Sequence, residues 1–235
     1  MASSRSRWRP LLWPVIILAA LAVVATLVIP EILSWRLESA LRESLGGRVS
    51  VRVAGVPWRL LAGSFDTLGM EARGIAVNQL PVARLALRLS DARVDLPVLF
   101  RENRLVLQSA SGGEGAVTLT RENVEQYLAA AKSIQSATVS LEEGLITIEG
   151  NVRVGELDLR ARLVGRLEIA SPTTVDLQVQ ELTVSGVEIP REVGALLVAS
   201  INPLINLAGL PVPARISSVA VEGGEATMTV RVDAR

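Results

Sequence analysis

The chain has 235 residues, of which 24 are basic, 24 are acidic and 49% are hydrophobic. Because it contains no histidine and no cysteine, Ser–His triads, Cys–His pairs, His-ligated zinc, disulfides and iron–sulfur clusters are excluded. The charge is balanced and the sequence has no basic motif or aromatic stacking signature, so nucleic acid is not an expected partner.

Residues 11–29 form an uncharged apolar run directly behind Arg5, Arg7 and Arg9. At about 1.5 Å per residue, a helix of this length covers most of a hydrocarbon core of about 30 Å. Positive charge is retained on the cytoplasmic side of a membrane. We therefore expect residues 1–10 to form a cytoplasmic tail and residues 11–29 a single membrane-spanning anchor. The remaining residues, 31–235, should form one domain outside the cytoplasmic membrane.

A cleaved signal peptide would share the basic start of this segment. Its apolar region usually has only about 7–15 residues and ends at a small-x-small site. Here the only such site, at residues 20–22, lies in the middle of the run, which closes on Ile29 and Pro30. The sequence therefore favours an uncleaved anchor.

An amphipathic helix is predicted over residues 31–45, between the anchor and the domain. Pro30 is well placed as the first residue of a new helix, and Gly46 with Gly47 ends it. The apolar side chains recur at three- and four-residue spacing; they are Leu33, Leu37, Ala40, Leu41 and Leu45.

From residue 48 onward the apolar period changes from about four to two, which is typical of strands. The longest alternating run, residues 157–169, would span roughly 43 Å at about 3.3 Å per residue. The alternation changes parity near Ser90–Asp91 and near Gln180–Glu181, which indicates β-bulges. Long bulged strands bend. We therefore expect an α+β fold in which a long, strongly curved antiparallel β-sheet wraps around helices, apolar inside and charged outside.

Two turns that contain glycine predict hairpins. Residues 222–225 read Glu-Gly-Gly-Glu between alternating segments, and Glu143 with Gly144 lies in a similar position. Consecutive hairpins form a meander, and no linker divides residues 31–235.

Two further helices are expected among the strands. Thr120 can cap a helix over residues 121–132. A second helix begins near Arg191, and no charge occurs from residue 193 to residue 214. Pro203 and two asparagines disfavour a second membrane span. A helix that is apolar on most sides is usually buried, so we expect it on the concave face of the sheet.

Two pairs of neighbouring residues could in principle carry catalysis. Glu142 and Glu143 are adjacent carboxylates, but they lie beside a turn and neighbouring strand residues point to opposite faces. Lys132 and Ser133 could form a Ser–Lys dyad, yet adjacent helix positions diverge. The sequence gives catalysis no support.

Asp66, Asp91 and Asp95 could in principle share a calcium ion. No loop has the dense spacing of Asp, Asn and Gly that such a site needs. We therefore expect no metal, no cofactor and no catalytic residue.

Residues 55–66 stand apart from the other loops because a proline and two glycines flank Trp58, Leu60, Leu61 and Phe65. One interpretation is a loop that packs these side chains on the core. The other is an apolar lip that touches lipid, with the Trp58 ring at the membrane interface.

From about residue 31 to residue 232 the chain resembles the LmeA-like phospholipid-binding proteins of the bacterial cell envelope. The motifs that carry the resemblance are GVPWRLLAG at 55–63, VTLTRENVEQYL at 117–128, and LPVP at 210–213 followed by VAVEGG at 219–224. The resemblance implies binding of an anionic phospholipid such as a phosphoinositide, and a role in envelope lipid or lipoglycan maintenance. It also implies a fold akin to tubular lipid-binding domains. Ala214 precedes Arg215 where family members often have an aromatic residue.

Together these observations predict a membrane-anchored, non-enzymatic phospholipid-binding protein with an apolar groove for acyl chains. Burial of each methylene contributes roughly 0.8 kcal/mol, so a groove can hold lipid without polar specificity. Arg59, Arg191 and Arg215 flank the apolar loops and are the predicted headgroup contacts. The predicted groove and lip are formed by Trp58, Leu60, Leu61, Phe65, Leu197, Ile201, Leu204, Leu207, Leu210 and Val212.

The alternative is an envelope scaffold or adaptor domain with a fully packed sheet and a protein partner, which would bind a sheet edge or the Trp58 loop. The interior of the sheet discriminates between the two. An open apolar channel favours lipid binding, and a filled concavity favours the scaffold.

Overall fold

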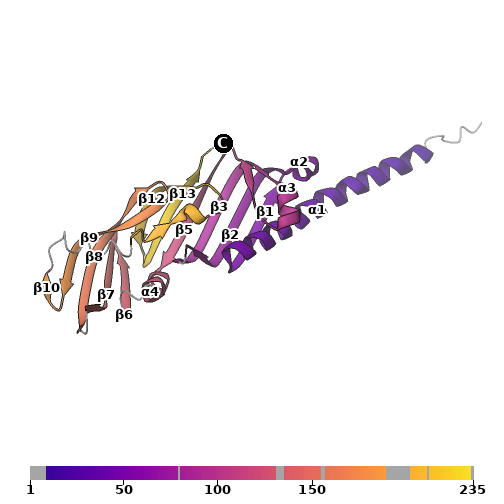
Figure 1. Ribbon diagram of the computed structural model, residues 1–235. Helices are drawn as coiled ribbons and strands as arrows, with labels where there is room; N and C mark the ends of the chain where they lie inside the picture. Colours follow the sequence, from indigo (N-terminus) through magenta and orange to yellow (C-terminus); the bar gives the residue numbers. More distant parts are fainter. Residues whose placement is uncertain are drawn as a thin grey trace, which may run out of the picture.

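A computed structural model describes residues 9–78, 80–130, 135–154, 157–188, 202–210 and 212–233. Within these ranges it leaves the side chains of 9–23, 25, 135, 152–154, 157–158, 187–188 and 209 undescribed. Two antiparallel sheets lie end to end and form an elongated, curled half-barrel (Figure 1). A long N-terminal helix lies across one end of the half-barrel and then projects away from it (Figure 1).

That helix, α1 (Arg9–Leu45), is continuous through Pro30. The prediction of a new helix starting at Pro30 is therefore wrong. Inside a helix a proline removes one backbone hydrogen bond and crowds the carbonyl four residues earlier, but its fixed φ is close to the helical value, and the long flanking segments continue the helix through it. Among the residues that the structure describes, no helix combines the length and the hydropathy that a membrane span requires.

The first sheet has seven strands in the order β1-β2-β3-β5-β13-β12, with β4 beside β3. The strands predicted from the alternation of apolar residues after residue 48 are confirmed in β1 and β3, and the hairpin at 222–225 joins β12 to β13 as expected. The strands are β1 (Arg48–Ala54), β2 (Ser64–Val77), β3 (Leu80–Val94), β4 (Leu107–Ser109), β5 (Gly112–Thr120), β12 (Arg215–Glu222) and β13 (Glu225–Val232).

The second sheet has six strands in the order β10-β9-β8-β7-β6, with β11 beside β9. The long alternating run is confirmed as a strand, and the turn at Glu143 and Gly144 joins β6 to β7 as expected. The strands are β6 (Gln135–Glu142), β7 (Leu145–Val154), β8 (Leu157–Ser171), β9 (Thr174–Val184), β10 (Val187–Glu188) and β11 (Ile205–Asn206).

The expected single sheet is thus two sheets that meet at β12. The Ile216 N–H donates to the Pro172 carbonyl at 2.7 Å, and the Gly144 N–H donates to the Val221 carbonyl at 2.9 Å. The chain leaves the first sheet after β5, builds the second, and returns through β12 and β13. A pure meander is therefore wrong, because this long return depends on which strand edges remain free rather than on any local pattern.

The β-bulge predicted near Gln180–Glu181 is confirmed, and the one predicted near Ser90–Asp91 is wrong. Gln180 is the extra residue of a β-bulge, since Val164 pairs with Glu181 and Gly165 with Val179. Near residue 90, Asp91 has a φ of 45° and no strand partner in the β2–β3 ladder. The register between β2 and β3 is the same on both sides of this point, where Asp91 lies opposite Asp66, so neither strand has an extra residue and there is no β-bulge.

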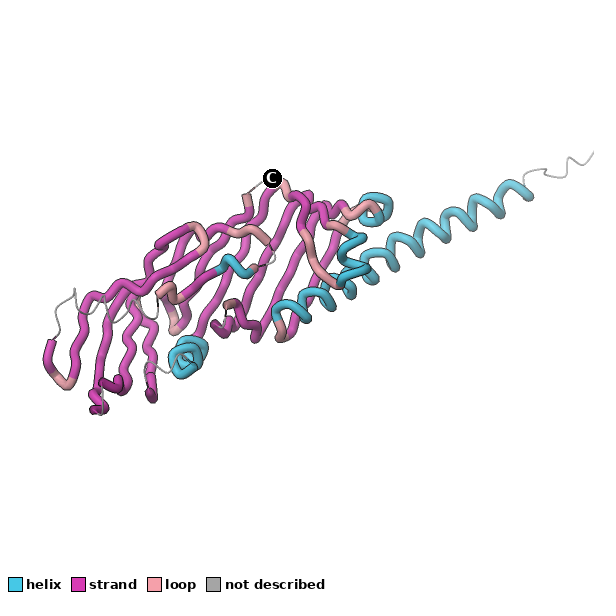
Figure 2. The backbone as a smooth tube through the Cα atoms, in the orientation of Figure 1, coloured by secondary structure: helices cyan, strands magenta, loops and turns pink. Residues whose placement is uncertain are grey.

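Three short helices lie at strand ends: α2 (Pro57–Leu61), α3 (Leu96–Glu102) and α4 (Arg121–Ala130). The 3-10 helix η1 (Leu207–Gly209) lies on the concave face (Figure 2). The predicted helix after Thr120 is confirmed as α4, and its last two expected residues lie outside the described part of the chain. The α3 helix was not predicted. Asp95 caps it, because the Val98 N–H donates to Asp95 Oδ1 at 3.1 Å.

The predicted apolar helix from Arg191 is wrong over residues 202–210, where β11 and η1 replace it. Asn202 holds this segment against β9: its Oδ1 accepts the Leu177 N–H at 3.0 Å, and its Nδ2 donates to the Leu177 carbonyl at 3.2 Å. Ile205 then pairs with Val175. An asparagine side chain that mimics a strand partner favours extended backbone over helix. Residues 189–201 lie outside the described residues.

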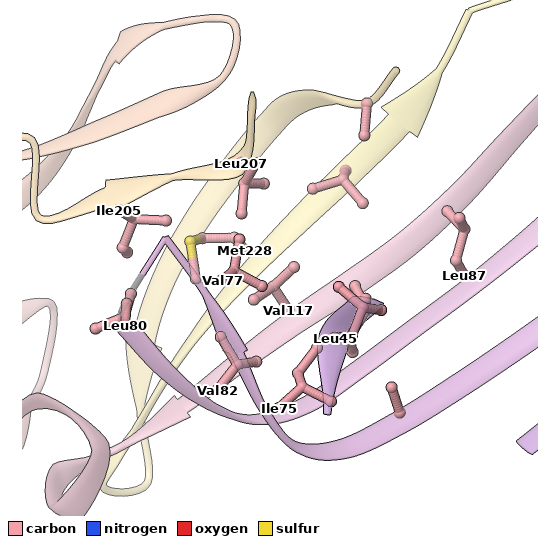
Figure 3. Close-up of a cluster of buried hydrophobic side chains, with 14 of the residues drawn as sticks. Leu45, Ile75, Val77, Leu80, Val82, Leu87, Val117, Ile205, Leu207 and Met228 are labelled. Carbon is pink, nitrogen blue, oxygen red and sulfur yellow. The ribbon is translucent and has the colours of Figure 1, made fainter. Parts of the chain in front are cut away.

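The core lies on the concave face, between the sheets and the segments laid into them. Leu33, Leu37 and Leu41 of α1 are almost completely buried there, and α1 packs against β1 and β2. Figure 3 shows the middle of this core, where side chains from α1, β2, β3, β5 and β13 meet Ile205 and Leu207.

Candidate functional site

The interior between α1 and the first sheet is entirely apolar but closed. Among the residues described there, a cavity has a volume of about 10 Å³, roughly what one water molecule requires. In this conformation it cannot hold an acyl chain. Its lining consists of Leu37, Leu41, Val51, Leu68, Met70, Leu87, Leu89, Leu105, Leu107 and Val212.

Further along the concave face, residues 202–214 occupy the place of the predicted groove. Leu204, Leu207 and Val212 are buried against the sheets, and Leu210 is half-buried. The Leu207 N–H donates to the Thr173 carbonyl at 2.8 Å, which fixes the segment to the second sheet. These side chains are apolar and face inward, but protein atoms occupy the space beside them. Leu197 and Ile201 lie outside the described residues.

The loop at 55–66 divides between its two interpretations. Leu60 and Phe65 have no exposed surface and pack into the core. Trp58 and Leu61 are 71% and 64% exposed. The short helix α2 produces part of this division, because Trp58 and Leu61 are three positions apart and share its exposed face, whereas Leu60 points toward the core.

Exposed apolar side chains gather where α1 leaves the sheet. We call this cluster the exit surface. It takes in the loop residues Trp58 and Leu61 and three residues that the sequence prediction did not include, and its members are Ile32, Trp35, Trp58, Leu61 and Phe100. Figure 2 shows α2 and α3 beside α1 at this end, and both helices contact α1.

A cation holds part of the exit surface together. The Arg36 guanidinium lies 5.1 Å from the centre of the Trp35 ring and 5.5 Å from that of the Phe100 ring. Contacts of this kind stabilise surface pairs by about 0.5–1 kcal/mol. The signal in the sequence was Trp35, three residues after Ile32 and on the opposite side of the helix from Leu33 and Leu37.

The structure does not bring the predicted headgroup arginines together. Arg59 forms ion pairs with Asp66 and, at 3.7 Å, with Asp91. Arg215 pairs with Asp233 at 2.7 Å on the far edge of the same sheet. Four strand positions separate β2 from β12, or roughly 19 Å at about 4.8 Å per strand. The two arginines therefore form no common phosphate site, and Arg191 lies outside the described residues.

A broad, open groove of about 620 Å³ lies on the outer face of the first sheet, opposite α1. Small residues such as Gly69, Ala86 and Ala116 form its floor, and the charged residues beside them include Arg52, Arg88, Glu71 and Glu114. A hydrogen bond from Arg73, with the charge of nearby Arg84, lowers the pKa of Glu71. The prediction missed this groove because it depends on small residues meeting across several strands.

The three aspartates that were weighed for calcium have structural partners. Asp66 and Asp91 both pair with Arg59, and Asp95 caps α3. Glu142 and Glu143 lie at the end of β6 and in the turn that follows. Within the described part of the chain no three metal-ligating side chains gather. Lys132 and Ser133 lie outside it.

Comparison with known proteins identifies a family. The profile of the LmeA-like phospholipid-binding family matches residues 24–231, and so runs from the exposed part of α1 through both sheets to β13. No curated protein and no solved structure gives a significant match.

Proposed function

We propose that this chain, which belongs to the LmeA-like phospholipid-binding family, is a membrane-anchored, non-enzymatic phospholipid-binding protein of the cell envelope. The family match carries the proposal, because it covers the whole β-structure rather than one motif. Anionic lipid, phosphoinositide among the candidates, and a role in envelope lipid or lipoglycan maintenance follow from the same membership.

Membrane attachment is supported by the N-terminal segment. Residues 11–29 carry no charge, and α1 continues from them directly into the domain. At the near end of this run Val24, Leu27 and Val28 are 43–69% exposed, so no protein surface covers them. The side chains of residues 11–23 lie outside the described residues. The three arginines before the run favour a cytoplasmic N-terminus and a domain outside the cytoplasmic membrane.

The concave interior is the proposed place for acyl chains. It is lined by aliphatic side chains from the α1 end to Val212, and burying acyl methylenes there would contribute roughly 0.8 kcal/mol each. Because the interior is closed in this conformation, uptake of lipid requires α1 or the segment around Leu207 to move off the sheet.

The first test is native mass spectrometry with lipid extraction on the full-length chain purified in detergent. The proposal predicts about one phospholipid per chain that survives detergent exchange, with anionic lipid in excess over its share of the membrane. A chain that carries none, and takes up none from anionic vesicles, contradicts lipid binding.

A matched set of variants separates bound lipid from lipid that merely surrounds the anchor. Leu204→Asp and Leu207→Asp place a charge on the concave face, and burial of an unpaired charge is strongly unfavourable. Each should abolish stable lipid occupancy. Arg162→Glu lies on the exposed outer face and should leave occupancy unchanged. Circular dichroism checks that the variants remain folded, and equal effects from both faces would refute the interior site.

A second candidate function is the envelope scaffold that binds a protein partner, and one observation favours it. The described interior is filled, with a cavity of only about 10 Å³, as a packed scaffold requires. A full-length chain that carries no phospholipid in native mass spectrometry, and takes up none from anionic vesicles, would support this function over lipid binding.

A further inference from the structure

Exposed large hydrophobic side chains are concentrated at one end of the molecule. Among the described residues, eight of the nine belong to α1, α2 or α3, and the ninth, Ile169, lies on β8 of the second sheet. Solvated surfaces scatter such residues singly, whereas a contiguous group marks a contact with lipid or protein. The clustering therefore indicates that this end of the molecule contacts lipid or another protein.

The α1 helix presents two apolar faces in this region. Leu33 and Leu37 are buried against the sheet. Val28, Ile32 and Trp35 follow each other at four- and three-residue spacing, lie on the opposite face and are exposed. A helix that only packed on the sheet would need just the first face. The second face continues the apolar surface of the preceding residues into the domain.

Helix geometry places the exit surface at the depth of lipid headgroups when residues 11–29 span the bilayer. Trp35 lies six residues beyond Ile29, or about 9 Å along the axis. The interfacial layer on each side of the hydrocarbon core is roughly 5–8 Å deep. Helical side chains lean toward the N-terminus, which brings the Trp35 ring back into that layer. Glu31 is exposed on the same face of α1, and its charge marks the point where this face leaves the hydrocarbon core.

The chemistry of the cluster suits a lipid interface better than a protein partner. Tryptophan is enriched at membrane interfaces because its ring is amphipathic, and two of the four tryptophans of the chain, Trp35 and Trp58, lie here. Arg36 adds a cation over the aromatic rings, where anionic phosphate can approach. Continuity with the uncharged run then selects the bilayer among apolar partners.

We propose that the exit surface rests on the outer leaflet of the membrane and holds the half-barrel at a fixed orientation to it. The inference rests on the proposed anchoring. With α1, α2 and α3 seated together, the domain cannot swing freely about its anchor, and the end of the interior nearest Leu60 and Phe65 faces the bilayer from which lipid would enter.

Nitroxide labelling tests the proposal, because the chain contains no cysteine. Single cysteines are introduced as Leu61→Cys in the exit surface and as Ile169→Cys in the second sheet, a matched position that is also apolar and exposed. Phe100→Cys on α3 gives an independent label if the first perturbs folding. The full-length chain is reconstituted into vesicles of equal parts phosphatidylcholine and phosphatidylglycerol, and its collisions with oxygen and with an aqueous nickel chelate are measured.

If the exit surface rests on the membrane, the ratio of oxygen to nickel collisions at residues 61 and 100 should be several-fold higher than at residue 169. Oxygen concentrates in lipid, whereas the chelate stays in water. Equal, water-like ratios at all three positions would overturn the proposal while leaving lipid binding and anchoring intact. A fall of both collision rates at residue 61 would indicate a protein contact and would overturn it too. If the chain does not float with the vesicles, it is not anchored in them, and the proposed contact of the exit surface with the membrane is refuted as well.

Discussion

Gly63 determines how the exit surface is presented. It has a φ of +77°, and a Cβ added there would lie 2.4 Å from the Val94 carbonyl oxygen. Its own carbonyl accepts the Val94 N–H at 2.8 Å. The close approach fixes the end of α2 against β3, and with it the direction of Trp58 and Leu61. A glycine here is therefore a structural requirement of the loop that carries two exposed apolar side chains.

Gly63→Ala should lower the free energy of unfolding by about 1–3 kcal/mol, the usual range for a strained left-handed residue. Gly69→Ala is the matched control, because its added Cβ would meet only the Arg52 carbonyl oxygen at 3.8 Å, an ordinary contact. There the loss of unfolded-state freedom predicts a gain of about 0.4–1 kcal/mol. Thermal unfolding of both variants measures the difference, and equal melting temperatures would contradict the constraint at Gly63.

Residue identity alone predicted that 55–66 was unusual but not how it divides. Pattern rules separate apolar from polar positions, and all four large side chains of the loop are apolar. Which of them are buried depends on the five-residue helix α2 and on the tight approach at Gly63. Trp35 and Phe100 escaped prediction for a related reason: each is a single aromatic residue, and only the packing of α3 beside α1 joins them.

At the level of elements, periodicity predicted most strands and one β-bulge, at Gln180. It failed where a tertiary contact overrides local preference. The apolar stretch after Arg191 has helical composition, yet Asn202 forms hydrogen bonds with both backbone groups of Leu177, and Ile205–Asn206 form a short strand beside β9. The prediction at Pro30 was also wrong: a proline that often marks the start of a helix lies here in the interior of a longer helix, α1.

At the level of the whole molecule, the curved sheet with its apolar interior was predictable and its division into two sheets was not. Alternation fixes which face of each strand is buried, but the order of strands depends on edges far apart in the sequence, such as β5 with β13. The prediction of a common headgroup site was wrong for the same reason: Arg59 and Arg215 are both close to apolar loops, but the strands beside them, β2 and β12, are four positions apart in the sheet.

The closed interior leads to a last prediction, in which one substitution lowers stability but raises lipid uptake. Leu37→Ala removes a fully buried side chain beside the small interior cavity and should lower the free energy of unfolding by about 2–5 kcal/mol. If acyl chains occupy this interior, the added space should nevertheless raise phospholipid occupancy. Leu128→Ala in α4 is equally buried but lines no part of that cavity, so it should lose similar stability without gaining lipid. Denaturant unfolding and native mass spectrometry on both variants decide the matter: a parallel fall or no change in occupancy would place the acyl chains elsewhere.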